Sequence, residues 1–176
     1  MSHAISDSPR SNRCSFFLAP CLGGLILLAA GCATFRIPTP ENFAKRASTR
    51  TSFSALTAEE EKLLVRHFTV LEKQSIGFWT EAVRNNLVQE RGYTLVEEGE
   101  FKTDGGVAGH RFLFEVSMGD VPYRYLLVVF ATRSWLRQHI YTAEFLCEKK
   151  NYEKHAPAVE KALKQFVPRG GKAMEK

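Results

Sequence analysis

The sequence lacks the short motifs that mark many enzymes and metalloproteins. It has no nucleophile elbow, no phosphate-cradling glycine loop and no His-Glu-x-x-His zinc motif. The histidines beyond residue 60 are far apart along the chain and predict no shared metal site; they are His67, His110, His139 and His155. We therefore expect a protein that is not an enzyme and that carries no metal and no cofactor.

An apolar run long enough to span a bilayer is also missing. The run over residues 16–30 contains 15 residues, whereas a spanning helix needs about 20. Arg10 and Arg13 precede this run, and it ends in the sequence Leu27-Leu28-Ala29-Ala30-Gly31-Cys32. A basic segment, an apolar segment and small residues in that order are typical of a secretory signal peptide.

The last six of these residues resemble the lipobox of bacterial lipoproteins. The resemblance implies that residues 1–31 are removed as a signal peptide and that the thiol of Cys32 takes a diacylglyceryl group. The residue after the cysteine is Ala33 and not an aspartate, which resembles the signal of lipoproteins that are sorted to the outer membrane. We therefore expect a lipid-anchored protein of a bacterial cell envelope, on the outer membrane and facing the periplasm.

Cysteine is scarce in the chain that would remain after processing. Cys14 and Cys21 leave with the signal peptide and Cys32 is lipidated, so Cys147 stands alone. An intramolecular disulfide is then excluded, and no Cys-x-x-Cys spacing indicates zinc or redox chemistry. Cys147 follows apolar residues, which predicts a buried thiol that acts as a small hydrophobe.

Charge is weakly unbalanced, with a formal net charge of +5 for the whole chain. The basic residues are spread along the sequence, whereas proteins that bind nucleic acid usually cluster them in a stripe. We expect no nucleic-acid partner, and a weak attraction to anionic lipid headgroups.

Composition divides the expected mature chain into three parts. Residues 32–50 contain Pro38, Pro40 and several basic residues with few apolar ones, which predicts a tether. Residues 51–167 show regular apolar periodicity and are long enough for one domain with its own core. Residues 168–176 are rich in glycine and lysine and predict a loose basic tail.

Two segments of the expected domain have helical spacing. Apolar residues recur at steps of three and four over residues 75–91, which predicts an amphipathic helix with Ser75 as its N-cap. The same spacing returns over residues 152–166. Pro157 has no amide hydrogen to donate, so we expect this second helix to begin near Ala156.

Strand patterns fill the rest of the domain, over residues 53–56, 63–71, 93–101, 112–116, 123–131 and 140–147. Residues 123–131 are apolar at almost every position, which predicts a strand covered on both faces. Thr57 and Glu60 match a capping box that would open a helix, so helix and strand remain alternatives for residues 57–71. The pattern as a whole predicts an α+β domain, a three-layer α/β/α sandwich with a largely antiparallel sheet.

Several of these segments resemble the PsbP-like family, which includes a photosystem accessory protein and many bacterial lipoproteins. The sequence Ile140-Tyr141-Thr142-Ala143, followed by Tyr152-Glu153-Lys154-His155-Ala156-Pro157 and Leu163-Lys164-Gln165-Phe166, is similar to that family's final strand and helix. Phe78-Trp79-Thr80-Glu81-Ala82-Val83 and Gly92-Tyr93 resemble the helix and strand entry of uncharacterised envelope proteins of this kind. The resemblance covers about residues 51–167 and consists of packing motifs, so it implies the PsbP-like fold and no activity.

The loop between the last two strands combines aromatic and basic residues. Arg133-Ser134-Trp135-Leu136-Arg137 has the length of a hairpin loop. Tryptophan favours interfaces between apolar and polar phases, and arginine binds phosphate. We predict that Arg133, Trp135 and Arg137 project together and contact a partner or the membrane. The alternative is that Trp135 folds back onto the core.

These observations favour a non-catalytic, lipid-anchored envelope protein that binds or supports an envelope component. Its partners would be the membrane, through the anchor, and an envelope protein. The alternative is a carrier of a small ligand or lipid that uses a pocket between the helix of residues 75–91 and the sheet. An enzyme is the third and least favoured class, because catalytic groups can converge without a sequence signature.

Overall fold

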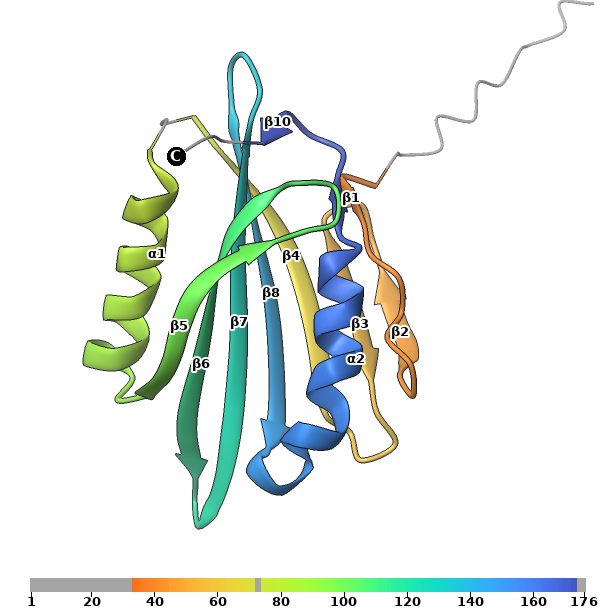
Figure 1. The fold of residues 1–176 in the computed structure, drawn as a ribbon, viewed down its shortest axis with the longest axis vertical. Coiled ribbons are helices and arrows are strands. Elements are labelled where there is room, and N and C mark those ends of the chain that lie inside the picture. The colour runs from red at the N-terminus through yellow and green to blue at the C-terminus, as the bar shows by residue number, and fades with distance from the viewer. Residues whose placement is uncertain (1–32, 72–73, 174–176) are drawn as a thin grey trace, which may run out of the picture. The chain divides into compact units, whose positions relative to one another are not determined.

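The computed structural model describes residues 33–71 and 74–173, and these form one antiparallel sheet with a helix on each face (Figure 1). The predicted signal peptide and Cys32 lie outside the described residues. Seven strands follow one another across the sheet in the order β2-β3-β4-β8-β7-β6-β5, and the short strand β10 adds to β7.

The bounds of the sheet strands are β2 Ala44–Ser48, β3 Ser52–Leu56, β4 Lys62–Val70, β5 Thr94–Lys102, β6 Ala108–Met118, β7 Val121–Arg133, β8 Gln138–Glu148 and β10 Lys172–Ala173. Two more short strands, β1 (Phe35–Arg36) and β9 (Val167–Pro168), pair with each other. All the strand pairs described are antiparallel.

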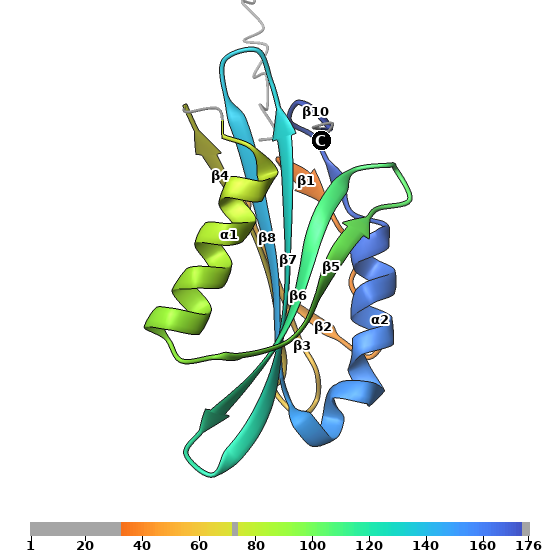
Figure 2. The same cartoon turned by 60° about the vertical axis from the view of Figure 1, so that its left-hand side comes forward.

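The two predicted helices lie on opposite faces of the sheet (Figure 2). Helix α1 (Ile76–Asn85) continues into a π-turn, η1 (Asn86–Glu90), and the hydroxyl of Ser75 caps it by accepting from the amide of Phe78 at 3.1 Å. Helix α2 (Tyr152–Lys164) follows a 3-10 turn, η2 (Lys149–Asn151). The structure thus confirms the predicted α+β fold with two helices and a largely antiparallel sheet.

Strand β7 is buried on both faces, as its apolar run predicts. Leu126, Val128 and Phe130 point into the core shared with α2. Their neighbours Leu127, Val129 and Ala131 point into the core beneath α1. Because side chains alternate between the two faces of a strand, one segment supplies the centre of both cores.

The two helices are packed very differently. Six residues of α2 are buried: Tyr152, His155, Ala156, Val159, Ala162 and Leu163. None of the ten residues of α1 is fully buried, although Ile76, Trp79 and Val83 pack partly buried against the core of this face, next to the buried Leu87 of the π-turn. Helix α2 is therefore an integral part of the core, whereas α1 rests on the sheet surface.

Helix α2 also begins earlier than the position of Pro157 predicts. Its first residue is Tyr152, and it continues through Pro157. Tyr152 is only 5% exposed, so burial of its ring against the core stabilises the first turn in spite of the hydrogen bond that proline cannot make.

The prediction of a tether over residues 32–50 is wrong for its described part. Phe35 is buried and its ring lies 5.6 Å from that of Phe166. Phe43 packs against Phe145 at 5.9 Å between ring centroids, and β2 pairs with β3. Two aromatic side chains inserted into the core are enough to hold a segment that is otherwise polar.

The alternative left open for residues 57–71 is resolved in favour of the strand, and one further expectation needs revision. Residues 62–70 are a strand, and the amide of Thr57 donates to the carbonyl of Glu61 at 3.0 Å, which closes a turn where a capping box would start a helix. The tail expected to be loose from residue 168 is paired as far as residue 173, first with β1 and then with β7.

Because β7 is buried on both faces, a charged side chain at its centre should strongly destabilise the fold. Val128→Asp would place a carboxylate where the present side chain is 0% exposed, and we expect it to lower the free energy of unfolding by about 4 kcal/mol or more. Val121→Asp, on the same strand at a position that is 39% exposed, is the control and should cost far less. Urea unfolding of both variants measures the difference, and a Val128→Asp protein as stable as the control would contradict the two-sided core.

Candidate functional site

The tip of the β7–β8 hairpin carries two of the three most exposed large apolar side chains of the described residues. Trp135 is 86% exposed and Leu136 is 65% exposed. The amide of Ser134 donates to the carbonyl of Arg137 at 2.8 Å, and the Ser134 hydroxyl donates to the same carbonyl at 2.9 Å. The loop is thus a rigid turn of residues 134–137, and Trp135 does not fold back onto the core.

The predicted loop is one residue shorter than the sequence indicates, since Arg133 pairs with Gln138 and belongs to β7. Arg133 and Arg137 are both exposed and stand directly before and after the Ser134–Leu136 segment. The three predicted contact residues therefore all lie at one exposed end of the hairpin.

Backbone contacts connect this hairpin to the start of the described chain. Arg133 pairs with Lys172 of β10. The amide of Arg169 donates to the carbonyl of Thr34 at 2.8 Å, and the amide of Thr34 donates to Arg50 at 2.9 Å. The tip of the β7–β8 hairpin, β10 and β1 accordingly lie at the same end of the domain (Figure 1). We call this the hairpin end.

Exposed cations gather at the hairpin end: Arg36, Arg50, Arg133, Arg137, Arg169 and Lys172. None of the six forms an ion pair with an acidic side chain among residues 33–71 and 74–173. By contrast, many exposed lysines elsewhere are paired, such as Lys161 with Glu41 at 2.6 Å. This end of the domain therefore presents uncompensated positive charge around an exposed tryptophan.

A cavity of about 550 Å³ lies between the first turn of α1 and the β5–β6 hairpin. Most of the lining surface is apolar and includes Ile76, Phe101 and Ala108. The polar and charged residues of the lining are Ser75, Thr80, Glu100, Lys102 and His110. Gly109 in β6 borders it, and a Cβ there would come within 2.6 Å of the Phe130 ring. A side chain at this position is thus excluded by the strand behind it.

Hollows continue along both sides of α1. A second cavity of about 380 Å³ shares Thr80 and His110 with the first, and burial lowers the pKa of His110. A third, of about 330 Å³, lies on the other side of the helix near Trp79 and Tyr125. Ile76, Trp79 and Val83 of α1 pack against the core of this face, but none of them is fully buried, and spaces remain on either side of the helix.

Two histidines that are far apart in the sequence meet on neighbouring strands. Nε2 of His67 on β4 lies 3.0 Å from Nδ1 of His139 on β8, and the rings stack. Burial lowers the pKa of both imidazoles, and the Arg50 and Arg137 guanidinium groups add to the effect at His67 and His139 respectively. The lowered pKa values favour the neutral imidazoles, and the two rings form a hydrogen bond between neighbouring strands of the sheet.

Two other groups of side chains bear on chemistry. Cys147 is 1% exposed and burial raises the pKa of its thiol, which confirms the prediction of a buried, inert cysteine. Glu59, Glu61 and His155, however, converge at the end of the domain away from the hairpin. Sequence spacing predicted no such cluster, because the two glutamates and the histidine meet only through the packing of α2.

No protein-family model matches the sequence, and no curated protein matches it either. Solved structures do resemble the fold. LpqN, which is involved in cell envelope biogenesis of Mycobacterium tuberculosis, superposes with a TM-score of 0.63 at 8% sequence identity, over 76% of this chain and 82% of LpqN. The cyanobacterial PsbP protein CyanoP from Synechocystis sp. PCC 6803 gives a TM-score of 0.54 at 11% identity, over 77% of this chain and 86% of CyanoP.

This chain has a PsbP-like fold. The likeness extends to the Ran-binding protein Mog1p of Saccharomyces cerevisiae, with a TM-score of 0.51 at 9% identity over 77% of this chain and 90% of Mog1p. At such low identities the PsbP-like fold is what these proteins share, and the expected fold is confirmed. Within the described residues, no helix is both long and apolar enough to cross a membrane.

Proposed function

We propose that this protein is a non-catalytic, lipid-anchored envelope protein whose hairpin end rests on the membrane while the domain binds an envelope component. The observation that carries the proposal is the position of Thr34. It lies two residues after Cys32 and is held by Arg50 and Arg169 at the hairpin end. Two residues span at most about 7 Å, so acyl chains on Cys32 would hold this end close to the bilayer.

The chemistry of the hairpin end suits a bilayer surface. Tryptophan prefers the headgroup region, where its ring is half solvated, and an exposed Trp135 next to Leu136 gains from that environment. Each basic residue near an anionic membrane surface contributes about 1 kcal/mol of attraction. The unpaired cations around the hairpin would therefore add to the affinity that the acyl chains supply.

The fold likeness to LpqN, a protein of cell envelope biogenesis, supports an envelope location. An outer-membrane position facing the periplasm is the finer part of the proposal and depends on Ala33 after the lipidated cysteine.

Removal of the lipidation site tests the anchor. Cys32→Ala, expressed as the full chain in a Gram-negative bacterium, should leave the membrane fraction and lack the mass of the lipid, because no thiol is available for acylation. Cys147→Ala is the matched control and should stay in the membrane fraction with its lipid. Membrane fractionation and mass spectrometry read the result. A Cys32→Ala protein that still pellets with membranes at the wild-type mass would contradict lipid anchoring.

Tryptophan fluorescence tests the membrane contact of the hairpin. In unlipidated mature chain with Trp79→Phe, Trp135 is the remaining tryptophan, and its exposure predicts a red-shifted, easily quenched emission. Vesicles that contain phosphatidylglycerol should shift the emission to the blue. Arg133→Gln with Arg137→Gln should weaken vesicle binding at least tenfold.

Lys150→Gln provides the control for charge, since Lys150 lies at the other end of the domain and pairs with Glu148 at 2.6 Å. Its vesicle affinity should stay within twofold of wild type. Emission that does not move with anionic vesicles would show that Trp135 has no part in membrane contact.

A lipid or small-ligand carrier is the second candidate, and the cavity of about 550 Å³ beside α1 favours it. Its volume is in the range of ligand pockets, and its few polar groups are set in apolar walls. A lipid tail could enter between α1 and the β5–β6 hairpin, since no buried side chain fixes the helix there.

Filling the cavity distinguishes the carrier from the anchored binding protein. Ala108 lines the cavity, and Ala108→Trp should lower at least tenfold the amount of lipid that mass spectrometry finds in protein purified from envelopes. Ala44→Trp, on the exposed strand β2, is the control and should retain any lipid. Equal lipid content in the two variants would rule out this cavity as the carrier site.

A further inference from the structure

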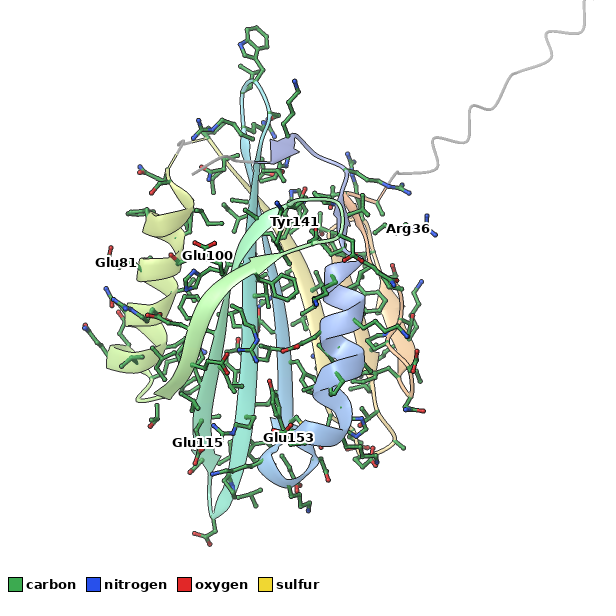
Figure 3. All side chains as sticks on the ribbon, in the orientation of Figure 1. Arg36, Glu81, Glu100, Glu115, Tyr141 and Glu153 are labelled. Carbon is green, nitrogen blue, oxygen red and sulfur yellow. The ribbon has the colours of Figure 1, made fainter. Side chains whose placement is uncertain are left out.

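The β3–β4 turn brings two glutamates against the first turn of α2. The hydroxyl of Thr57 accepts from the amides of Glu59 and Glu61, each at 3.2 Å, and Glu60 between them has a left-handed φ of 65°. These hydrogen bonds and this uncommon backbone conformation hold the turn in one shape. Its acidic side chains face α2, whose first turn lies at the end opposite Arg36 (Figure 3).

His155 stands between the two carboxylates. Its Nε2 lies 3.5 Å from Oε2 of Glu59 and 3.4 Å from Oε2 of Glu61. One oxygen or nitrogen of each residue lies within 4.8 Å of those of the other two. The imidazole is fixed from behind by Phe43, whose ring meets it edge-on at 5.9 Å.

Two of the buried polar atoms in this cluster lack a hydrogen-bond partner. Glu61 is 6% exposed and His155 is 2% exposed. Oε1 of Glu61 accepts from Nδ2 of Asn151 at 2.8 Å, but Oε2 of Glu61 and Nε2 of His155 have no hydrogen-bond partner among the described residues. Buried polar atoms are nearly always satisfied, so two unsatisfied atoms that face each other indicate a group bound between them.

The geometry points to a binding site for a divalent metal ion of the zinc class, formed by Glu59, Glu61 and His155. Zn²⁺ binds imidazole nitrogen and carboxylate oxygen at about 2.0–2.2 Å, and a tetrahedral arrangement then separates the ligand atoms by roughly 3.4 Å. The two distances from Nε2 of His155 match this spacing. An imidazole ligand favours Zn²⁺ over Mg²⁺ or Ca²⁺, which prefer oxygen alone.

A cavity borders two of the three proposed ligands. Lys154 binds Oε1 of Glu59, so that Oε2 remains directed at His155. The cavity has a volume of about 350 Å³, and its lining residues are Glu59, Glu60, Glu61, Lys62, Tyr123, Leu146 and Glu148. Four of these seven residues are glutamates and one is a lysine, so the lining favours the approach of a cation from solution.

Titration of the chelator-treated full chain, purified in detergent, with Zn²⁺ tests the proposal by isothermal calorimetry. We expect one saturable site per chain. Glu59→Gln and His155→Gln should each weaken Zn²⁺ binding at least tenfold. Glu59 is exposed, so the Glu59→Gln protein keeps its fold and decides the matter if His155→Gln does not fold.

His139→Gln is the matched control, because it disrupts the contact between His67 and His139 and leaves the β3–β4 turn intact. It should bind Zn²⁺ as the wild type does. Zn²⁺ should also raise the thermal midpoint of the wild type and of His139→Gln, but not that of Glu59→Gln.

Three results would overturn the metal site. The first is a titration in which Zn²⁺ produces no saturable heat, which would make the cluster a buried polar contact between Glu61 and His155. Binding could persist unchanged in Glu59→Gln, or it could be lost in His139→Gln, which would place the ion at His67 and His139 instead.

Discussion

The burial of β7 on both of its faces is the constraint on which the rest of the structure depends. Its side chains alternate between a core under α2 and a core under α1, so the strand cannot shift by one residue without exchanging the two sets. It pairs with β6 over residues 121–130 and with β8 over residues 123–133, and β10 pairs with Thr132 and Arg133. A strand held in register in this way carries the β7–β8 turn, with the exposed Trp135, beyond the last pair that β7 forms with β6.

The parts of the fold that depend on local periodicity were predictable. The apolar run of β7 indicates a strand covered on both faces, and the helical spacing of α1 and α2 indicates one apolar face on each helix. The packing of residues 33–48 could not be predicted in this way, because Phe35 and Phe43 are single aromatic residues in a polar segment and form no periodic pattern. Residues 57–71 stayed open between helix and strand for another reason. The hydroxyl that caps a helix can equally close a turn between two strands, and only the pairing of β3 with β4 decides between them.

The candidate sites also differ in how far the sequence could predict them. The exposure of Trp135 follows from loop length, since a four-residue turn has no room to return a large ring to the core. The cavity beside α1 was expected between the helix and the sheet, but its size depends on how loosely α1 is seated, which no single-residue pattern encodes. The approach of His155 to Glu59 and Glu61 depends on how α2 crosses the sheet. A search for short-range metal motifs therefore could not have found it.

The length of β7 sets the distance between the proposed membrane anchor and the proposed metal site, which lie near its opposite ends. Arg133 pairs with Gln138 at one end of the β7–β8 ladder, and Tyr123 pairs with Glu148 at the other. Ten steps of about 3.4 Å separate these pairs, roughly 34 Å in all. This is several times the Debye length of about 8 Å in physiological salt, so the carboxylates around Glu61 neither repel an anionic membrane nor weaken its attraction for the hairpin end. A protein anchored through Cys32 would then present the metal site to the surrounding solution, beyond the reach of lipid headgroups. The occupant of that site must come from the aqueous side.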